Sequence, residues 1–415
     1  MISVDHQLRT FQNSVDFWVL NALRTDYQDF RMLVHSLPGV FPTNALESVC
    51  RLSSRRLIST VKAQYLINSA ERKSFHFPDR PVSNLPVPHP LDFDWRFDLQ
   101  AVNHLSKICE SISDFVVCLG TPSLFEHFRR QPKTRTAFVD SNLAAIEHFG
   151  TSRFEQVVKY NCFYDPVPMV RSDVIVMDPP WYDQHSQAFL WVAAQMCNID
   201  GKVLVSLPPL GTRDGVESER TRLFDFARQN GLIVESLHEG VLPYQTPHFE
   251  HNTLQRLGIH CPLGSWRCGT LVIFQKLLHN RVSRPLATAV EKWSELSLFG
   301  TRIRIRTDNG SRSDDPRLLP LVPGNVINSV SRNNPMRAEV DVWTSGNRVF
   351  RCDAPQELFE VGMELSERNE ESPTRLRRIL SCPRHRAAQN QILRIARLES
   401  NERRLLNPVQ GVQFS

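Results

Sequence analysis

Lysine is scarce in this chain of 415 residues, because only eight of its 49 basic residues are lysine and the other 41 are arginine. No apolar run reaches the length of about 18 residues that a membrane-spanning helix needs, so we expect no contact with a membrane. The opening residues MISVDHQLRTFQ hold no basic segment followed by an apolar one, and we expect no secretory signal. The nine cysteines form no C-x-x-C pair, which argues against a zinc ribbon or a disulfide scaffold and favours the reducing cytoplasm.

A hydrophobic fraction of 41% and a charged fraction of 22% are typical of a folded protein and exclude wholesale disorder. A chain of this length usually forms two or three domains. The arginine surplus suits contact with phosphate groups, because guanidinium forks match phosphate oxygens. The alternative is a G+C-rich coding sequence, which encodes arginine in preference to lysine.

Residues 1–80 are predicted to form a helical module. Apolar side chains recur at helical spacing over 15–33, a second helix is expected over 45–52, and residues 55–67 fit either a further helix or a pair of strands. Short helices with a Pro-Gly turn resemble a winged-helix module, which can contact duplex nucleic acid. The alternative is a helical cap that packs on the next domain.

Residues 81–278 are predicted to form an α/β domain with a proline-rich lead-in. Five prolines between residues 76 and 94 exclude a helix there, and Trp95 and Phe97 then either wall a pocket or pin this linker to the domain. From residue 99 on, helices and strands alternate, which predicts a parallel, doubly wound sheet whose ligands bind beyond the carboxyl ends of the strands. The expected helices are 99–112, 123–131, 186–197 and 216–230, and the expected strands are 114–120, 135–142, 157–163, 172–182, 201–208, 231–239 and 266–276.

Residues 279–415 no longer show the alternation of helices and strands and are predicted to form an α+β extension. Residues 295–308 alternate like a strand, residues 340–352 are typical of a hairpin, and residues 353–367 fit a helix.

The tail of the extension, from residue 373 to 405, carries nine arginines against Glu399 and Glu402. Clustered arginine favours binding along nucleic-acid phosphates. The alternative is a solvated helix whose leucines and isoleucines pack inward, and both readings can hold at once.

The sharpest signal is Asp178-Pro179-Pro180-Trp181-Tyr182, which follows the apolar run VIVM. It suits methylation of a weakly nucleophilic amine: the Asp178 carboxylate accepts one hydrogen and the Pro179 carbonyl the other, so that the nitrogen lone pair points at the methyl donor. The prolines hold both acceptors in place, and Trp181 offers a flat face for a base. The structural alternatives are an ordinary strand-ending turn and ordinary packing of Trp181.

This motif resembles the Asp/Asn/Ser-Pro-Pro-Tyr/Phe/Trp motif of the N6-adenine (amino) methyltransferases, which use S-adenosylmethionine. The segment CLGTPSLFE (118–126) is similar to the Cys/Phe-x-Gly-Thr-Pro start of the "probable N6-adenine methyltransferase" family, which includes eukaryotic ribosomal-RNA adenine and protein-lysine methyltransferases. The likeness covers residues 114–276, under half of the chain. It implies that residues 81–278 form a Rossmann-like class I methyltransferase domain.

The resemblance also implies the residues of the site. Gly120 takes the place where the backbone approaches the cofactor, and Asp140 that of the acid that holds the ribose hydroxyls. Gly120 stands without the usual Gly-x-Gly, which argues against a nicotinamide cofactor. The implied catalytic residues are Asp178, Pro179, Pro180 and Trp181. The implied cofactor-binding residues are Gly120, Thr121, Pro122, Asp140, Phe163, Asp165 and Asp178.

A long polar loop is expected over residues 242–265, and loops at this edge usually wall the substrate. Each of its polar and aromatic residues can also be an ordinary loop residue. The candidates for substrate binding are Trp181, Tyr182, Tyr244, His248 and Phe249, with Glu250 beside them. We expect no metal. The candidate ligands would be Cys261, Cys268, Cys382 and His385, and the spacing of these residues fits no zinc module.

These observations predict an S-adenosylmethionine-dependent methyltransferase acting on adenine N6 in DNA or RNA, with the helical module and the arginine-rich extension holding the polymer. A duplex target would require flipping of the base, whereas a single strand would not. Two alternatives stay open. One is a protein-lysine methyltransferase on the same scaffold, and the other is a nucleic-acid-binding protein whose cofactor pocket is degenerate, as the lone Gly120 suggests.

Overall fold

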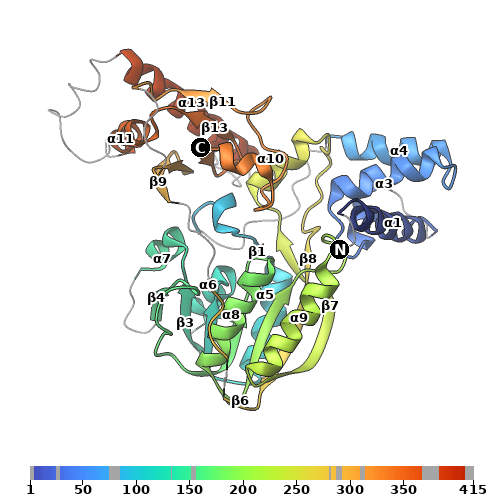
Figure 1. Cartoon of the computed structure of the whole chain (residues 1–415), viewed down its shortest axis with the longest axis vertical. Coiled ribbons are helices and arrows are strands. Elements are labelled where there is room, and N and C mark those ends of the chain that lie inside the picture. Colours follow the sequence, from blue (N-terminus) through green and yellow to red (C-terminus); the bar gives the residue numbers. More distant parts are fainter. Residues whose placement is uncertain are drawn as a thin grey trace, which may run out of the picture. The chain divides into compact units, whose positions relative to one another are not determined.

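The chain divides into two compact units, each built from several stretches of sequence. The domain limits predicted at residues 80 and 278 therefore stay predictions. Among the described residues, no helix combines the length and the apolar character needed to cross a membrane. The first unit comprises Met1–Leu85, Trp95–Thr246 and Ile259–Thr288, and the second Pro86–Asp94, Pro247–Gly258 and Ala289–Ser415. Figure 1 shows the computed structural model, which describes residues 4–24, 29–73, 85–131, 133–150, 156–279, 282–286, 292–308, 314–366 and 383–406.

An eight-stranded sheet with the order β1-β7-β8-β6-β5-β2-β3-β4 forms the centre of the first unit (Figure 1). Strands β2 to β6 run parallel to one another, whereas β8 is antiparallel to both β6 and β7. The predicted Rossmann-like, doubly wound fold is confirmed. The sheet differs from the predicted parallel sheet in that β8 runs in the opposite direction. The strands are β1 (Arg96–Phe97), β2 (Phe115–Leu119), β3 (Arg135–Asp140), β4 (Gln156–Lys159), β5 (Ser172–Met177), β6 (Cys197–Leu207), β7 (Leu232–Gln245) and β8 (Cys268–Lys276).

The reversal of β8 follows from its connection. A parallel strand needs a crossover that returns the chain to the opposite edge of the sheet. The chain leaves β7 at Gln245, passes through the helix α10 (His248–Arg256) and enters β8 at the same edge of the sheet, so β8 runs back from the edge at which β7 ends.

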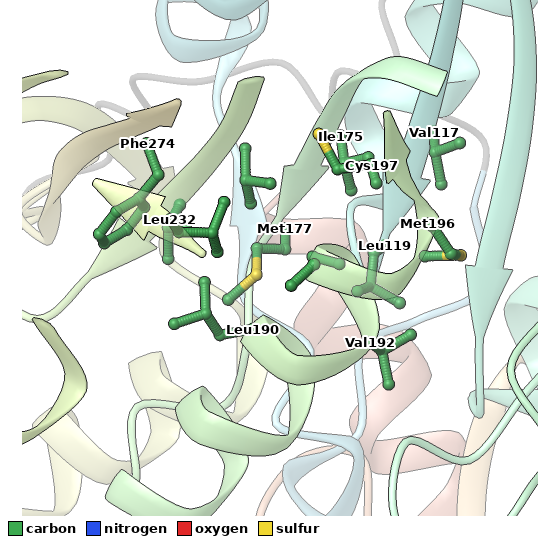
Figure 2. Packing of buried hydrophobic residues seen from close by; sticks show 14 of the residues in the cluster. Val117, Leu119, Ile175, Met177, Leu190, Val192, Met196, Cys197, Leu232 and Phe274 are labelled. Carbon is green, nitrogen blue, oxygen red and sulfur yellow. The ribbon is translucent and has the colours of Figure 1, made fainter. Parts of the chain in front are cut away.

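Helices cover both faces of the sheet, because successive strand residues point to opposite sides. Figure 2 shows Leu119 and Met177 in one apolar layer with Leu190 and Val192 of α8. The alternate strand residues pack on the other face against α5, α6 and α7. The helices are α5 (Leu99–Glu110), α6 (Pro122–Arg129), α7 (Leu143–Phe149), α8 (Asp183–Met196) and α9 (Val216–Gln229).

The N-terminal module contains four helices and no strand within residues 4–24 and 29–73. The helical alternative for residues 55–67 is confirmed from Thr60 on, and the described part of the module has no wing of the winged-helix type. Buried Asp16 accepts hydrogen bonds from Ser48 at 2.7 Å and from Arg51 at 2.8 Å, which fixes α1 against α3. The helices are α1 (Val4–Ala22), α2 (Phe30–Ser36), α3 (Pro42–Ser54) and α4 (Thr60–Glu71).

This module packs on the carboxyl-terminal edge of the sheet. The Gly211 N–H, in the loop after β6, donates to the Pro38 carbonyl at 2.8 Å, and the His35 ring lies 2.6 Å from the Leu263 carbonyl in the segment before β8. The alternative of a helical cap on the next domain is therefore what the structure shows.

The second unit holds a five-stranded antiparallel sheet with the order β11-β13-β12-β10-β9. The predicted hairpin and the helix that follows it are confirmed as β12, β13 and α11. The single strand predicted over residues 295–308 is wrong: Phe299 and Gly300, with φ of 51° and 72°, form a two-residue hairpin turn between β9 and β10. The elements are β9 (Trp293–Leu298), β10 (Thr301–Arg306), β11 (Leu318–Pro320), β12 (Val342–Thr344), β13 (Val349–Cys352), α10 (His248–Arg256), α11 (Pro355–Ser366) and α13 (Pro383–Leu406), with the 3-10 helices η1 (Pro90–Asp92) and η2 (Pro335–Glu339).

Buried ionic contacts hold α13 to this sheet. Arg348 donates to Glu399 at 3.2 Å and to Glu402 at 2.6 Å. Burial raises the pKa of the Glu402 carboxyl, but contacts with His248 and Arg348 outweigh burial and lower the pKa to about 2.

Acidification should therefore loosen the second unit. A carboxyl whose folded pKa is depressed gives stability that is fully present above its unfolded value of 4.5 and is lost as the pH falls toward 2. We expect the wild type to lose roughly 1–2 kcal/mol more than Glu402→Gln between pH 5 and 3, after allowance for solvent screening. Unfolding midpoints measured across this range test the prediction. The control is Glu339→Gln, which removes an exposed partner of Arg351. Identical pH profiles for the wild type and Glu402→Gln would contradict the prediction.

Candidate functional site

Three neighbouring parallel strands end side by side and place Asp140, Gly120 and Asp178 in one row. The Gly120 N–H donates to the Val139 carbonyl of β3 at 3.0 Å, and the Asp178 N–H donates to the Leu119 carbonyl of β2 at 3.2 Å. Since adjacent strands lie about 4.8 Å apart, one acidic residue flanks Gly120 on each side. The row includes the point where the strand order reverses, between β2 and β5, which is the usual ligand position in such sheets.

Gly120 lies where the neighbouring atoms leave no room for a side chain. Its φ is +69°, a conformation that side chains disfavour, and a Cβ there would lie 2.9 Å from the Phe189 ring and 3.2 Å from the Asp178 carbonyl oxygen. Thr121 follows as the buried N-cap residue of α6, and Pro122 is its first helical residue. A glycine is thus required here both by the backbone and by the neighbouring atoms.

The Asp140 carboxylate is oriented by the backbone of its own turn. Its Oδ1 accepts a hydrogen bond from the Asn142 N–H at 2.9 Å, and Asn142, not Asp140, is the N-cap residue of α7. After β4, Asp165 accepts from the Asn161 N–H at 2.7 Å, and Phe163 lies edge-on to His185 at 5.2 Å between ring centroids. The roles predicted for Asp140, Phe163 and Asp165 in cofactor binding stay predictions.

A chain of hydroxyl groups holds the Asp178 carboxylate. The Tyr244 hydroxyl donates to Asp178 Oδ1 at 2.6 Å and lies 2.5 Å from the Ser206 hydroxyl. Because the Tyr244 hydroxyl has a single hydrogen, Ser206 must donate to Tyr244. Burial, and then the negative charge of Asp178, raise the pKa of Tyr244 well above its usual value. Tyr244 therefore keeps its proton and fixes one carboxylate oxygen.

The Pro179 carbonyl provides a second acceptor beside this carboxylate. The Pro180 carbonyl accepts from the Tyr182 N–H at 2.6 Å. The Pro179 carbonyl accepts no hydrogen bond from any residue that the structure describes. Asp178, which Tyr244 holds, and the Pro179 carbonyl thus provide two acceptors in consecutive residues.

Trp181 is 8% exposed and packs in an aromatic cluster. Its ring lies perpendicular to Tyr244, with 5.6 Å between centroids. The Arg267 guanidinium carbon lies 4.1 Å from the Trp181 ring centroid and 4.2 Å from that of Trp95. The Arg267 guanidinium thus covers one face of each of the two indole rings. Stacking of a base on Trp181 stays a prediction.

The prediction of one loop over residues 242–265 is wrong. Strand β7 extends to Gln245, and the helix α10 follows at His248–Arg256. A short polar helix that begins after Pro247 has the composition of a loop, so the sequence pattern did not separate the two. His248, Phe249 and Glu250 lie buried in α10, which belongs to the second unit, and the structure does not bring them into one unit with Asp178. Their substrate contacts stay predictions, as does that of Tyr182, which lies half-buried at the start of α8.

Two residues of the site were not anticipated from the sequence. Ser206 interrupts the apolar strand VLVSLP, and such a lone hydroxyl was a usable signal. Arg267 carried no local signal, since only the fold places it against Trp95 and Trp181. Arg375, Arg377, Arg378 and Cys382 lie outside the described residues.

No family model matches the chain, and no curated protein matches it in sequence. One similar solved structure is the C9 mutein of the branched-chain polyamine synthase from Thermus thermophilus, with 13% identity over 69% of this chain and 95% of that chain and a TM-score of 0.49. A mutant of the 16S rRNA (adenine(1408)-N(1))-methyltransferase from Catenulisporales acidiphilia is also similar. It has 13% identity over 42% of this chain and 91% of that chain, with a TM-score of 0.28. TrmN from Thermus thermophilus has 14% identity over 42% of this chain and 48% of that chain, with a TM-score of 0.29. Similarity at this level assigns no role to any residue of the chain.

Proposed function

We propose that this site transfers a methyl group from S-adenosylmethionine to an exocyclic amine, and that adenine N6 in DNA or RNA is its target. The observation that supports the proposal is the pair of fixed acceptors at the strand switch point. Asp178 is held by Tyr244, and the Pro179 carbonyl accepts no hydrogen bond from the described residues.

The residues of the strand-end row fit the cofactor. Gly120 carries no side chain, so that a ligand could approach its backbone closely. Asp140, oriented by Asn142, would hold ribose hydroxyls, and Phe163 and Asp165 would contact the adenine of the cofactor. When bound, S-adenosylmethionine supplies an electrophilic methyl carbon on a positively charged sulfur.

The two acceptors would prepare the amine for attack. The lone pair of an exocyclic adenine nitrogen is delocalised into the ring, which makes the nitrogen a weak nucleophile. Hydrogen bonds from its two N–H groups to Asp178 and to the Pro179 carbonyl favour a tetrahedral nitrogen with a directed lone pair. As the N–C bond forms and the C–S bond breaks, the nitrogen gives up one proton, for which Asp178 provides an acceptor. Positioning supplies most of the effect.

Trp181 is the residue on which the adenine base would stack. Trp181 and Trp95 already hold a planar guanidinium at stacking distance. A base that stacks on the same face of Trp181 would have to displace Arg267.

Tyr244→Phe should lower kcat about 10-fold while leaving the KM for S-adenosylmethionine nearly unchanged. The variant removes the hydrogen bond that orients Asp178 but keeps the aromatic ring in place. Steady-state kinetics separate the two constants. Tyr160→Phe is the matched control, because this buried hydroxyl contacts Arg284 instead of Asp178. A rise in KM alone would show that Tyr244 does not position the carboxylate.

Incubation with tritiated methyl donor, followed by separation of nucleic acid from protein, tests the proposed substrate class. We expect label in the nucleic-acid fraction. Label confined to protein would instead establish a lysine-type methyltransferase. A thermal shift with S-adenosylmethionine or its demethylated product tests the cofactor independently, since a bound ligand stabilises the folded state. Absence of any shift would favour a binding protein with a degenerate pocket.

A further inference from the structure

The long helix α13 exposes a continuous arginine-rich face. The exposed residues of this face follow one another at intervals of three or four, which places them on one side of a helix. We call this face the arginine stripe. It consists of Arg386, Asn390, Arg394, Arg397, Asn401 and Arg404. At a rise of about 1.5 Å per residue, the stripe is roughly 27 Å long.

The opposite side of α13 fixes the helix to the second unit. Ala388, Ile392 and Ala396 pack in the apolar core of the five-stranded sheet. The Ala396 carbonyl accepts a hydrogen bond from the Thr301 hydroxyl at 3.0 Å, and Glu399 is fully buried against Arg348. The stripe is therefore presented by a helix that is already ordered, and its arginines need no folding step before they contact a ligand.

The acidic residues of α13 lie away from the stripe. Glu399 and Glu402 are both engaged by Arg348 on the other side of the helix. Arg394 and Arg404 form no ion pair with any residue that the structure describes. Arg397 lies over the Phe299 ring at 5.2 Å, an arrangement that leaves its charge intact. These three arginines of the stripe thus keep their positive charge available to an anionic ligand.

We propose that the arginine stripe binds the phosphodiester backbone of a nucleic-acid strand. Guanidinium groups match phosphate oxygens, and the two asparagines add neutral donors and acceptors between them. A membrane surface fits less well, because an interfacial helix inserts its apolar face into the lipid, and here that face is buried in the protein. The inference does not depend on methyl transfer, since it concerns a separate unit and a separate step.

The test is the affinity of the full chain for labelled 20-nucleotide RNA and DNA strands, measured by fluorescence anisotropy over a series of salt concentrations without a methyl donor. We expect the double variant Arg394→Gln/Arg404→Gln to weaken binding about 10-fold at roughly 0.1 M salt. We also expect it to lower the slope of log affinity against log salt by about 1.5, the value for two lost phosphate contacts. Binding of either polymer in this manner supports the proposal.

The matched control is Arg317→Gln/Arg351→Gln, which removes the same charge from two arginines of this unit that are paired with Asp315 and Glu339. The control should keep the wild-type slope, and both variants should keep the wild-type unfolding midpoint. Equal weakening by both pairs, or no weakening by the stripe pair, would overturn the proposal. The proposal would also be overturned if the stripe variant lost binding to anionic phospholipid vesicles but still bound RNA and DNA like the wild type. That result would assign the stripe to a membrane.

Discussion

Asp178→Ala should lower methyl transfer by at least about 10²–10³-fold, the usual cost of losing one prearranged hydrogen-bonding group at a reacting centre. The variant removes the acceptor for one amine hydrogen and leaves the buried Tyr244 hydroxyl without its partner. The dissociation constant of S-adenosylmethionine should change only a few-fold, because Gly120 and Asp140 remain. Single-turnover kinetics and calorimetric titration of the cofactor measure the two effects separately.

Asp178→Asn provides the matched comparison. Asparagine keeps the shape and one carbonyl acceptor but loses the charge, so we expect activity between that of the wild type and that of Asp178→Ala. If the asparagine and alanine variants were equally inactive, the negative charge would matter more than the accepted hydrogen bond. If both lost cofactor binding as well, Asp178 would serve the cofactor or the fold instead of the amine.

Gly120→Ala should weaken cofactor binding and thereby lower activity. The added Cβ would meet the Phe189 ring at 2.9 Å and the Asp178 carbonyl oxygen at 3.2 Å, and the φ of +69° is strained for alanine. The backbone strain alone costs about 1–2 kcal/mol. We expect the dissociation constant of S-adenosylmethionine to rise at least about 10-fold, corresponding to about 1.4 kcal/mol or more.

Gly240→Ala separates backbone strain from the loss of space. Gly240 has a similar φ of +65°, but a Cβ there would meet no atom within 4 Å. Both variants should therefore lose stability through strain, whereas only Gly120→Ala should bind the cofactor more weakly. Equal cofactor affinity in the two variants would show that the Gly120 backbone does not approach a ligand.

Much of the first unit was predictable because its strands are short apolar runs that end in polar residues. VIVM before Asp178 and the apolar segment before Gly120 identify central strands, since both faces of such strands are buried. The hairpin of β9 and β10 was missed because each of its strands alternates by itself. The shift of the apolar positions from Leu296 and Leu298 to Ile303 and Ile305 marks the turn, but the prediction did not use it. The direction of β8 depends on the path of a connection, which residue patterns do not encode.

The row of Asp140, Gly120 and Asp178 was predictable because parallel strands end at one edge. The Tyr244–Asp178 hydrogen bond joins residues 66 positions apart and requires the register of β7, so the sequence named Tyr244 without its partner. For α13, the sequence predicted the arginine surplus. The separation of its faces became visible only once burial was known, because Glu399 and Glu402 turn toward Arg348.

The identity of the methylated atom tests the central claim most directly. The protein is incubated with RNA and with DNA and a donor that carries a trideuterated methyl group, and the digested nucleosides are examined by mass spectrometry beside the same reaction with Asp178→Ala. The proposed geometry predicts trideuteromethyl on adenine N6 with the wild type and its absence with the variant. Label on a ring nitrogen or a carbon, or the same label with Asp178→Ala, would contradict it.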